Sequence, residues 1–322
     1  MMRGVAFCLG CAAMLLLGSC ASVEYVYDPN AGKQLGDTTI ADAALPEGKT
    51  QAMIVVGHVE LVAKDGTCTS LKRGMIFGEG ATIRTVKGAN ALLVMSNGAV
   101  IKESENSVLT FQHFRQTGYN QESEGAFLRL SKDPSKSNSQ LNLTSGMATI
   151  EVKKLDIEDG SRFAINTPAG IFNVAGTILE ISAGTDSNGH ANAVAANCIT
   201  GTVDFRPTVR VTASQALIQS LAQNGFVELK SSAQILVKLD VLDYSGKTCG
   251  NLYAAAVPID ELQKKANDLQ SIVNASGSTS LFPLPAVTIA PPDTLWPNGV
   301  ETVPLVPLPL PTKDIEHADG CS

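Results

Sequence analysis

Asp-Gly and Asn-Gly pairs divide the middle of the chain into short apolar segments, and this pattern constrains the possible folds more than any other feature. Such pairs tolerate the positive φ that two-residue hairpin turns need. The four pairs are Asp65-Gly66, Asn97-Gly98, Asp159-Gly160 and Asn188-Gly189. Within one segment, residues 178–183, side chains alternate as they do in a strand. A succession of hairpins and short strands predicts a mainly β domain over residues 53–256, folded as a sandwich, barrel or roll and not as an α/β fold.

The composition suits a chain with a packed core of aliphatic side chains. Its 322 residues fit one large β domain or two smaller domains. Hydrophobic residues make up 44% of the chain and aromatic residues only 5%, so we expect aliphatic side chains to fill most of the core. The formal net charge is −7 and no basic patch stands out, which argues against a nucleic-acid partner.

The first twenty residues have the features of an export signal. Arg3 supplies a positive start, and residues 4–18 form an uncharged apolar run. The run is too short for a membrane span, which needs about 20 apolar residues, but it suits the apolar region of a secretory signal. The sequence Leu17-Gly18-Ser19-Cys20 then resembles the lipobox of bacterial lipoproteins. The alternative is an ordinary signal peptide that is cut elsewhere, in which case Cys20 is incidental.

The lipobox resemblance implies a modification and a location. In bacterial lipoproteins a diacylglycerol, with acyl chains such as palmitate, is attached to the cysteine sulfur, and the signal is cut just before that cysteine. We therefore expect a signal peptide at residues 1–19, cleavage between Ser19 and Cys20, and lipidation of Cys20. Ala21, where inner-membrane lipoproteins carry Asp, favours the outer membrane and a periplasm-facing chain. No later apolar run is long enough to span a bilayer, so acyl groups would provide the only anchor.

Segments outside the predicted strands have distinct compositions. Residues 20–52 are polar and mixed, and we expect a tether there. Residues 132–139 contain Pro134 within a polar stretch and predict a long surface loop. Residues 214–223 predict a short helix, and residues 226–242 return to strand-like sequence.

The C-terminal part divides into a helical segment, residues 257–281, and a Pro-rich tail, residues 282–322. The helix is expected over residues 259–274, capped by Asp260. Its apolar side chains fall near one face; they are Leu262, Ala266, Leu269 and Val273. Nine prolines between residues 282 and 312 predict a semi-rigid extended spacer, with docking on an aromatic groove as the alternative.

A series of segments within the β region resembles the FecR family of periplasmic signalling domains. In order they are Gly57-His58-Val59, residues 71–74, residues 78–85, residues 91–101, residues 141–146, residues 163–170, Val174-Ala175-Gly176-Thr177 with Glu180, and Gly201-Thr202-Val203. Ala175 occupies the position where the family usually has Arg. The resemblance spans residues 53–242 and implies an antiparallel sandwich or roll of FecR-like type.

The resemblance does not imply that this chain has the whole role of the family. Its characterised members relay a signal from an outer-membrane transporter to a cytoplasmic sigma factor, which requires a transmembrane helix and a cytoplasmic segment. We expect neither here. The glycines of these motifs and Pro168 are predicted to serve turns and close strand packing; the glycines are Gly78, Gly80, Gly98 and Gly176.

Residue types that could carry chemistry show no catalytic or metal-binding pattern. The histidines, His58, His113, His190 and His317, lack metal-ligand spacing, and no G-x-S-x-G sequence is present. The carboxylate pairs Glu103/Glu105 and Glu122/Glu124 are expected to solvate loops or strand faces. Gly78-Glu79-Gly80 is too short and acidic for a phosphate cradle. No catalytic residue, cofactor or metal is predicted.

Four cysteines follow Cys20, and they form no C-x-x-C pair that would indicate zinc or thioredoxin-like chemistry. They are Cys68, Cys198, Cys249 and Cys321. Export makes disulfides plausible, and the sequence leaves all three complete pairings open.

These observations favour a non-catalytic, lipid-anchored module that binds or serves as a signalling accessory in the cell envelope. Its partner would be another envelope protein or an extended polymer such as peptidoglycan. One alternative is a hydrolase of envelope polysaccharide, which would need two carboxylates about 5–10 Å apart across a cleft. The other is a passive structural lipoprotein with the tail as a spacer.

Overall fold

The computed structural model describes residues 25–30, 45–118, 132–240 and 247–275. Within these ranges the chain is mainly β, as predicted, with two helices, α1 (Gln215–Asn224) and α2 (Ile259–Ala275). The strands form two sheets that share the long strand β10 (Ser137–Glu151), so that all 19 are linked by hydrogen bonds. No helix among the described residues has the length and apolar character that crossing a membrane requires.

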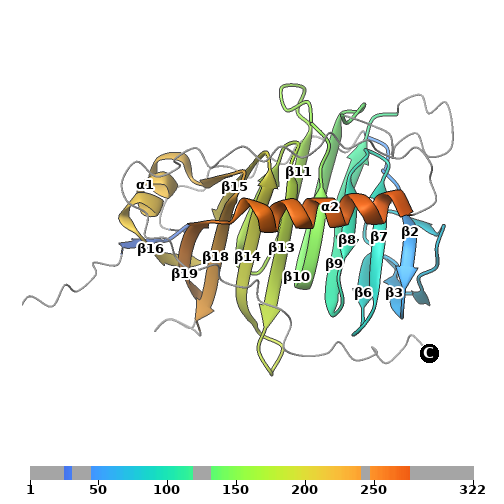
Figure 1. The fold of residues 1–322 in the computed structure, drawn as a ribbon, viewed down its shortest axis with the longest axis horizontal. Coiled ribbons are helices and arrows are strands. Elements are labelled where there is room, and N and C mark those ends of the chain that lie inside the picture. The colour runs from blue at the N-terminus through green and yellow to red at the C-terminus, as the bar shows by residue number, and fades with distance from the viewer. Residues whose placement is uncertain (1–24, 31–44, 119–131, 241–246, 276–322) are drawn as a thin grey trace, which may run out of the picture.

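Sheet A and sheet B face one another across the main core, and the strands of both sheets follow one another along the long axis of the molecule (Figure 1). In order across sheet A run β5 (Ile76–Phe77), β2 (Thr50–Val56), β7 (Asn90–Met95), β8 (Val100–Glu103), β10, β13 (Ile178–Thr185), β14 (Ala191–Thr200), β18 (Ala233–Asp240), β19 (Cys249–Ala256), β16 (Arg210–Ala213) and β1 (Tyr25–Tyr27). In order across sheet B run β4 (Cys68–Ser70), β3 (Val59–Val62), β6 (Thr82–Thr85), β9 (Ser107–Gln116), β10, β11 (Arg162–Asn166), β12 (Gly170–Val174), β15 (Thr202–Pro207) and β17 (Val227–Lys230).

Most neighbouring strands are antiparallel, as predicted, but β10–β11 and β16–β19 are parallel. The first parallel pair corrects the role of Asp159-Gly160. That pair closes no hairpin, because it lies in the connection that carries the chain from the sheet A part of β10 back to sheet B. The other three turn pairs do join antiparallel neighbours.

Strand β10 passes from sheet B to sheet A at Gly146. Residues 137–145 pair with β9 in sheet B, whereas residues 146–151 pair with β13 in sheet A. Gly146 has a φ of 91°, and a Cβ there would overlap the backbone of Ser107. Only glycine adopts this positive φ without strain and leaves room for Ser107, so Gly146 fixes the point at which the chain changes sheets.

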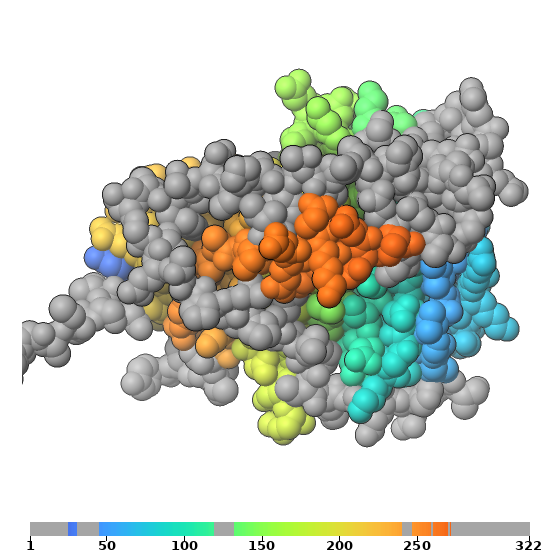
Figure 2. Space-filling view, viewed as in Figure 1, coloured from blue at the N-terminus to red at the C-terminus, as the bar shows by residue number. Residues whose placement is uncertain are grey.

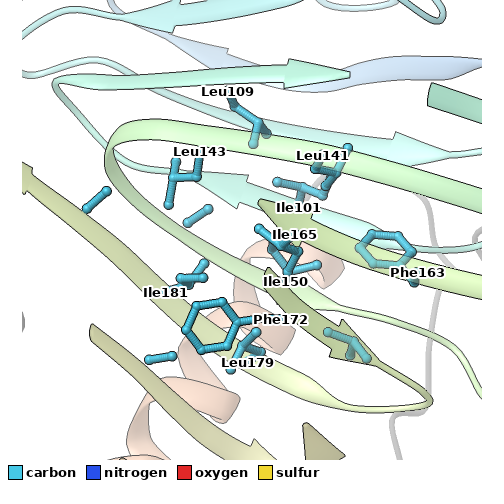
Figure 3. Close-up of a cluster of buried hydrophobic side chains, with 14 of the residues drawn as sticks. Ile101, Leu109, Leu141, Leu143, Ile150, Phe163, Ile165, Phe172, Leu179 and Ile181 are labelled. Carbon is cyan, nitrogen blue, oxygen red and sulfur yellow. The ribbon is translucent and has the colours of Figure 1, made fainter. Parts of the chain in front are cut away.

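The main core lies between the two sheets (Figure 3). Sheet A contributes aliphatic side chains such as Ile101, Ile150 and Ile181, as the composition predicted. The largest fully buried aromatic side chains come from sheet B; they are Phe111, Phe114, Phe163, Phe172 and Phe205.

Helix α2 lies across the outer face of sheet A and forms a third layer (Figures 1 and 2). The side chains of Leu262, Ala266 and Leu269 are buried in a second apolar cluster. Their partners from the sheet are Leu92, Val94, Val100, Ile178 and Ile199. The predicted helix and three of its four apolar positions are thus confirmed, but Asp260 lies within the first turn of α2 and not at its N-cap. The side chain of Val273 lies outside the described residues.

Helix α1 confirms the other helical prediction. It begins after Ser214 and ends at Gly225, whose φ of 75° is the left-handed conformation common at helix C-termini. Leu217 and Leu221 are buried against the main core.

The predicted surface loop at residues 132–139 is wrong. Asp133, Ser135, Ser137 and Ser139 are buried, and β10 begins at Ser137. The side chain of Asn97 donates to the hydroxyls of Ser137 and Ser139 at 3.3 and 3.2 Å. Because these polar groups satisfy one another, a segment that reads as polar can be buried.

Parts of the stretch predicted as a tether, residues 20–52, belong to the fold. Tyr25–Tyr27 forms β1 and pairs with β16, and β2 begins at Thr50. The predicted signal peptide, Cys20 and the Pro-rich tail lie outside the described residues.

Candidate functional site

The outer face of sheet B is covered by no described helix and carries polar side chains. They alternate with buried core residues along each strand, so that Leu141 and Leu143 point inward while Gln140 and Asn142 point outward. We call this surface the open face. It is made by Thr82, Thr110, Gln112, Gln140, Asn142, Thr144, Asn166, Asn173, Thr202, Asp204, Arg206 and Glu228, all half-buried or exposed.

Strand register arranges these side chains in rows across the sheet. One row runs Thr82, Thr110, Asn142, Asn166, Ile171 and Arg206. The neighbouring row runs His113, Gln140, Ala164, Asn173, Asp204 and Glu228. Adjacent strands lie about 4.8 Å apart, so each row offers a side chain at that spacing.

The amides and hydroxyls of the open face are only partly used within the protein. Thr82 and Thr110 share a hydroxyl–hydroxyl hydrogen bond of 2.9 Å. Asn166 Nδ2 donates to Gln112 Oε1 at 2.7 Å, while Asn166 Oδ1 is buried and accepts no hydrogen bond among the described residues. Asn142 Nδ2 donates to Thr144 Oγ1 at 3.3 Å. Gln112 and Thr144 are exposed, so their amide and hydroxyl groups can donate hydrogen bonds to an uncharged polar ligand and accept hydrogen bonds from it.

An acidic pair lies at one side of the open face. Asp204 and Glu228 are direct neighbours across β15 and β17. Burial and the Glu228 charge raise the pKa of Asp204 above its ordinary value, and the Arg206 charge opposes this. A hydrolase needs two carboxylates that face each other across a cleft. Asp204 and Glu228 instead lie next to one another on one face of a sheet.

Glu79 organises an ion cluster next to the open face. Arg115 donates to the Glu79 carboxylate through Nε at 3.0 Å and Nη2 at 3.3 Å, and His113 Nδ1 lies 3.0 Å away. Burial opposes ionisation, but the hydrogen bonds from Arg115 and the Phe114 N–H outweigh it and lower the pKa of Glu79. Gly78-Glu79-Gly80 therefore holds a structural ion cluster in place of a ligand cradle.

The other candidate residues from the sequence lie apart from one another. Glu103 is buried in the core, whereas Glu105 Oε2 accepts from the Gly88 N–H. His58 Nε2 lies 3.3 Å from Glu60 Oε1. In an exposed turn, His190 Nδ1 lies 3.7 Å from Asp186 Oδ2. Among the described ranges no three His, Cys, Asp or Glu residues are grouped as a metal site. His317, Glu122 and Glu124 lie outside them.

The Thr-Pro and Gly-Thr motifs support turns and close backbone contacts. Thr167 Oγ1 donates to Gly170 O at 2.7 Å in the turn between β11 and β12. Gly201 has a φ of 83°, and a Cβ there would lie 2.7 Å from Gly176 O. Thr177 Oγ1 donates to Thr202 O at 2.8 Å.

Beneath α2 lies a polar ladder that the sequence reading missed. Lys265 Nζ donates to Glu180 Oε1 at 2.5 Å, and Asn197 Nδ2 donates to the same oxygen at 3.2 Å. Gln234 Nε2 in turn donates to Asn197 Oδ1 at 2.9 Å. The motif residue Glu180 thus fastens α2 to sheet A.

Comparison with known proteins gives one family match. Residues 81–204, which run from just before β6 into β15, match the family described as FecR protein. Two crystal structures of a candidate anti-sigma factor from Parabacteroides distasonis are similar, each with 15% identity over 59% of this chain and a TM-score of 0.36. The chain spans 64% of the length of that protein. No curated protein matches the chain. The chain therefore contains a FecR family domain at residues 81–204.

Proposed function

We propose that this chain is a non-catalytic binding module of the bacterial cell envelope. In this proposal Cys20 anchors it to the outer membrane, and the open face of sheet B holds an extended glycan such as peptidoglycan. The observation that carries the proposal is the contrast between two outer faces, of which one is covered by α2 and the other is left half-exposed with amide and hydroxyl groups.

The chemistry of the open face suits a glycan. Sugar hydroxyls and N-acetyl groups both donate and accept hydrogen bonds, as Asn, Gln and Thr side chains do. The rows of side chains repeat at about 4.8 Å across the strands, so an extended polymer could contact several of them. The centre of the open face, at Gln140, Asn142 and Asn166, carries no formal charge, which favours an uncharged polar partner.

Binding is tested by co-sedimentation of the purified full-length chain with peptidoglycan sacculi. We expect the wild type to sediment and the double variant Asn142→Ala/Asn166→Ala to bind at least tenfold more weakly. The matched control is Gln263→Ala/Asn267→Ala, which removes a hydrogen-bonded amide pair on the exposed side of α2. Equal binding by all three proteins, or sedimentation of none, would contradict the proposal.

Anchoring through Cys20 is tested separately. Intact-mass measurement of the chain from cells should give a mature protein that begins at Cys20 and carries an acyl mass. Cys20→Ser removes the sulfur that accepts the diacylglycerol, so that variant should lose the acyl mass and leave the membrane fraction or accumulate uncleaved. An unmodified wild-type chain that begins elsewhere would refute the anchor.

A signalling-accessory role is the second candidate, and the FecR family domain at residues 81–204 favours it. In this role, occupancy of the open face would be passed to another envelope protein. Transcript profiles of cells with the wild-type chain and with Asn142→Ala/Asn166→Ala should then differ in the genes controlled by one sigma factor. Identical profiles would count against signalling and leave the binding role standing.

The hydrolase alternative can be examined on the same sacculi. Because Asp204 and Glu228 share one face, we expect the chain to release no soluble glycan fragments. Release by the wild type that Asp204→Asn or Glu228→Gln abolishes would overturn the non-catalytic assignment.

A further inference from the structure

Cys68 forms one half of a disulfide bond. It begins β4, the edge strand of sheet B, where it pairs with Val62 and is half-buried. Its location on an edge strand leaves it accessible to a chain segment that arrives from outside the sheet.

The other described cysteines are excluded as its partner, since Cys198 and Cys249 are both free thiols. Cys198 is buried in β14, and burial raises the pKa of its thiol to about 12, so it remains protonated and unreactive. Cys249 begins β19 in sheet A. The partner of Cys68 is therefore one of the remaining cysteines of the chain, which are Cys8, Cys11, Cys20 and Cys321.

Three of these four cysteines have another fate under the proposed function. Cys8 and Cys11 lie in the apolar run that is removed with the signal peptide, and the sulfur of Cys20 carries the diacylglycerol. We infer that Cys68 is joined to Cys321, so that the C-terminal tail is covalently tied to the edge of sheet B. The exclusion of Cys20 rests on the proposed anchor.

The bond forms by oxidation of two thiols. Each sulfur loses its proton, one S–S bond forms, and two electrons pass to a disulfide oxidant of the exported compartment. The oxidant takes up both electrons and two protons and becomes a dithiol.

This link changes the role of the Pro-rich tail. Helix α2, which precedes the tail, is held on sheet A by its apolar cluster and by Lys265. The C-terminal end of α2 lies beside β2, at the same end of the molecule as β3, the strand to which β4 pairs (Figure 1). With Cys321 bonded to Cys68, the segment between α2 and Cys321 would be held to the fold at both of its ends.

Peptide mapping without reduction tests the link, because trypsin places Cys68, Cys198, Cys249 and Cys321 on four separate peptides, none of which contains Cys20. The purified full-length chain is denatured in the presence of a thiol-blocking reagent and digested. We expect residues 65–72 to appear linked to residues 314–322, and reduction to replace that species by the two separate peptides with two added hydrogens. Blocked thiols are expected on the peptides that contain Cys198 and Cys249.

The same digest separates failure of the inference from failure of the anchor. A blocked thiol at Cys68 beside an acylated Cys20 would overturn the inference and leave the anchor intact. A Cys68–Cys321 link beside an unacylated Cys20 would support the inference and refute the anchor, whereas a Cys68–Cys20 link would refute both. Cys321→Ser should expose Cys68 to the blocking reagent, and the matched control Cys249→Ser should leave the linked peptide unchanged.

Discussion

The outer faces of sheet A and sheet B carry similar polar side chains in different surroundings. On sheet A, Asn197 and Gln234 are buried beneath α2 and belong to the ladder that ends at Lys265. On sheet B, Asn142 and Asn166 are half-buried and bond mainly to their neighbours within the open face. The same residue types thus fasten a structural layer on one side and remain available to a ligand on the other. Burial and partners, and not residue type, distinguish a structural polar row from a candidate binding row.

Both sheets depend on the crossing of β10, so the largest effect is expected at Gly146. Gly146→Ala combines a strained positive φ with overlap of the Ser107 backbone and should lower the free energy of unfolding by about 2–5 kcal/mol. Gly88→Ala is the matched control, because Gly88 has a φ of 74° with no atom near its Cβ position, and it should cost about 1–2 kcal/mol. Urea denaturation of both variants measures the difference. Equal losses would show that the crossing has room for a side chain.

The contrast between the covered and open faces predicts unequal costs of truncation. Leu262→Ala empties part of the apolar cluster beneath α2 and should cost about 2–4 kcal/mol. Thr144→Ala on the open face is exposed and should change stability by less than about 0.5 kcal/mol. Urea denaturation measures the loss of stability in each variant. Similar losses would contradict the predicted contrast between the covered face and the open face.

The ladder beneath α2 should matter less than its apolar cluster. Lys265→Met leaves the carboxylate of Glu180, whose side chain is 7% exposed, without its cation. Because Lys265 itself is 26% exposed, solvent screening reduces the cost to about 1–2 kcal/mol. Lys264→Met, at an exposed position of the same helix, is the control and should be neutral. A neutral Lys265→Met would show that apolar contacts alone hold α2.

The Glu79 ion cluster gives the smallest effect, and it depends on pH. The folded state lowers the pKa of Glu79, so its contribution is present above the unfolded pKa of about 4.3 and is lost as pH falls through the folded pKa. Glu79→Gln should therefore destabilise the protein at pH 7 by about 1 kcal/mol and lose that effect in acid. Glu158→Gln, at an exposed carboxylate, should show no such pH dependence in urea denaturation.

Local signals in the sequence predicted the elements well, because turns and helices are fixed by neighbouring residues. The glycines of the Asp-Gly and Asn-Gly pairs all have positive φ, and α1 and α2 lie where the periodicity placed them. Long-range pairing was not available from these signals. The return of β11 to the side of β10 is one example, since Asp159-Gly160 reads like any hairpin pair.

The candidate site was only partly predictable for the same reason. Alternation in β10 indicates which side chains point outward but not whether another element covers them. A covering layer on sheet A did leave a signal, because β7 is buried on both faces and reads as a nearly continuous apolar run. The buried serines at the start of β10 left none, since their burial depends on Asn97, which lies 40 residues away from Ser137 in the chain.

Site-specific photo-crosslinking in intact cells tests most directly whether the open face contacts the partner. A photoreactive residue replaces Gln112 on the open face in one strain and Gln263 on the exposed side of α2 in another. The account predicts a high-mass product at Gln112 that a peptidoglycan-degrading enzyme shortens, and little or no such product at Gln263. A product of equal yield at both positions, or only at Gln263, would contradict the assignment of the open face as the binding surface.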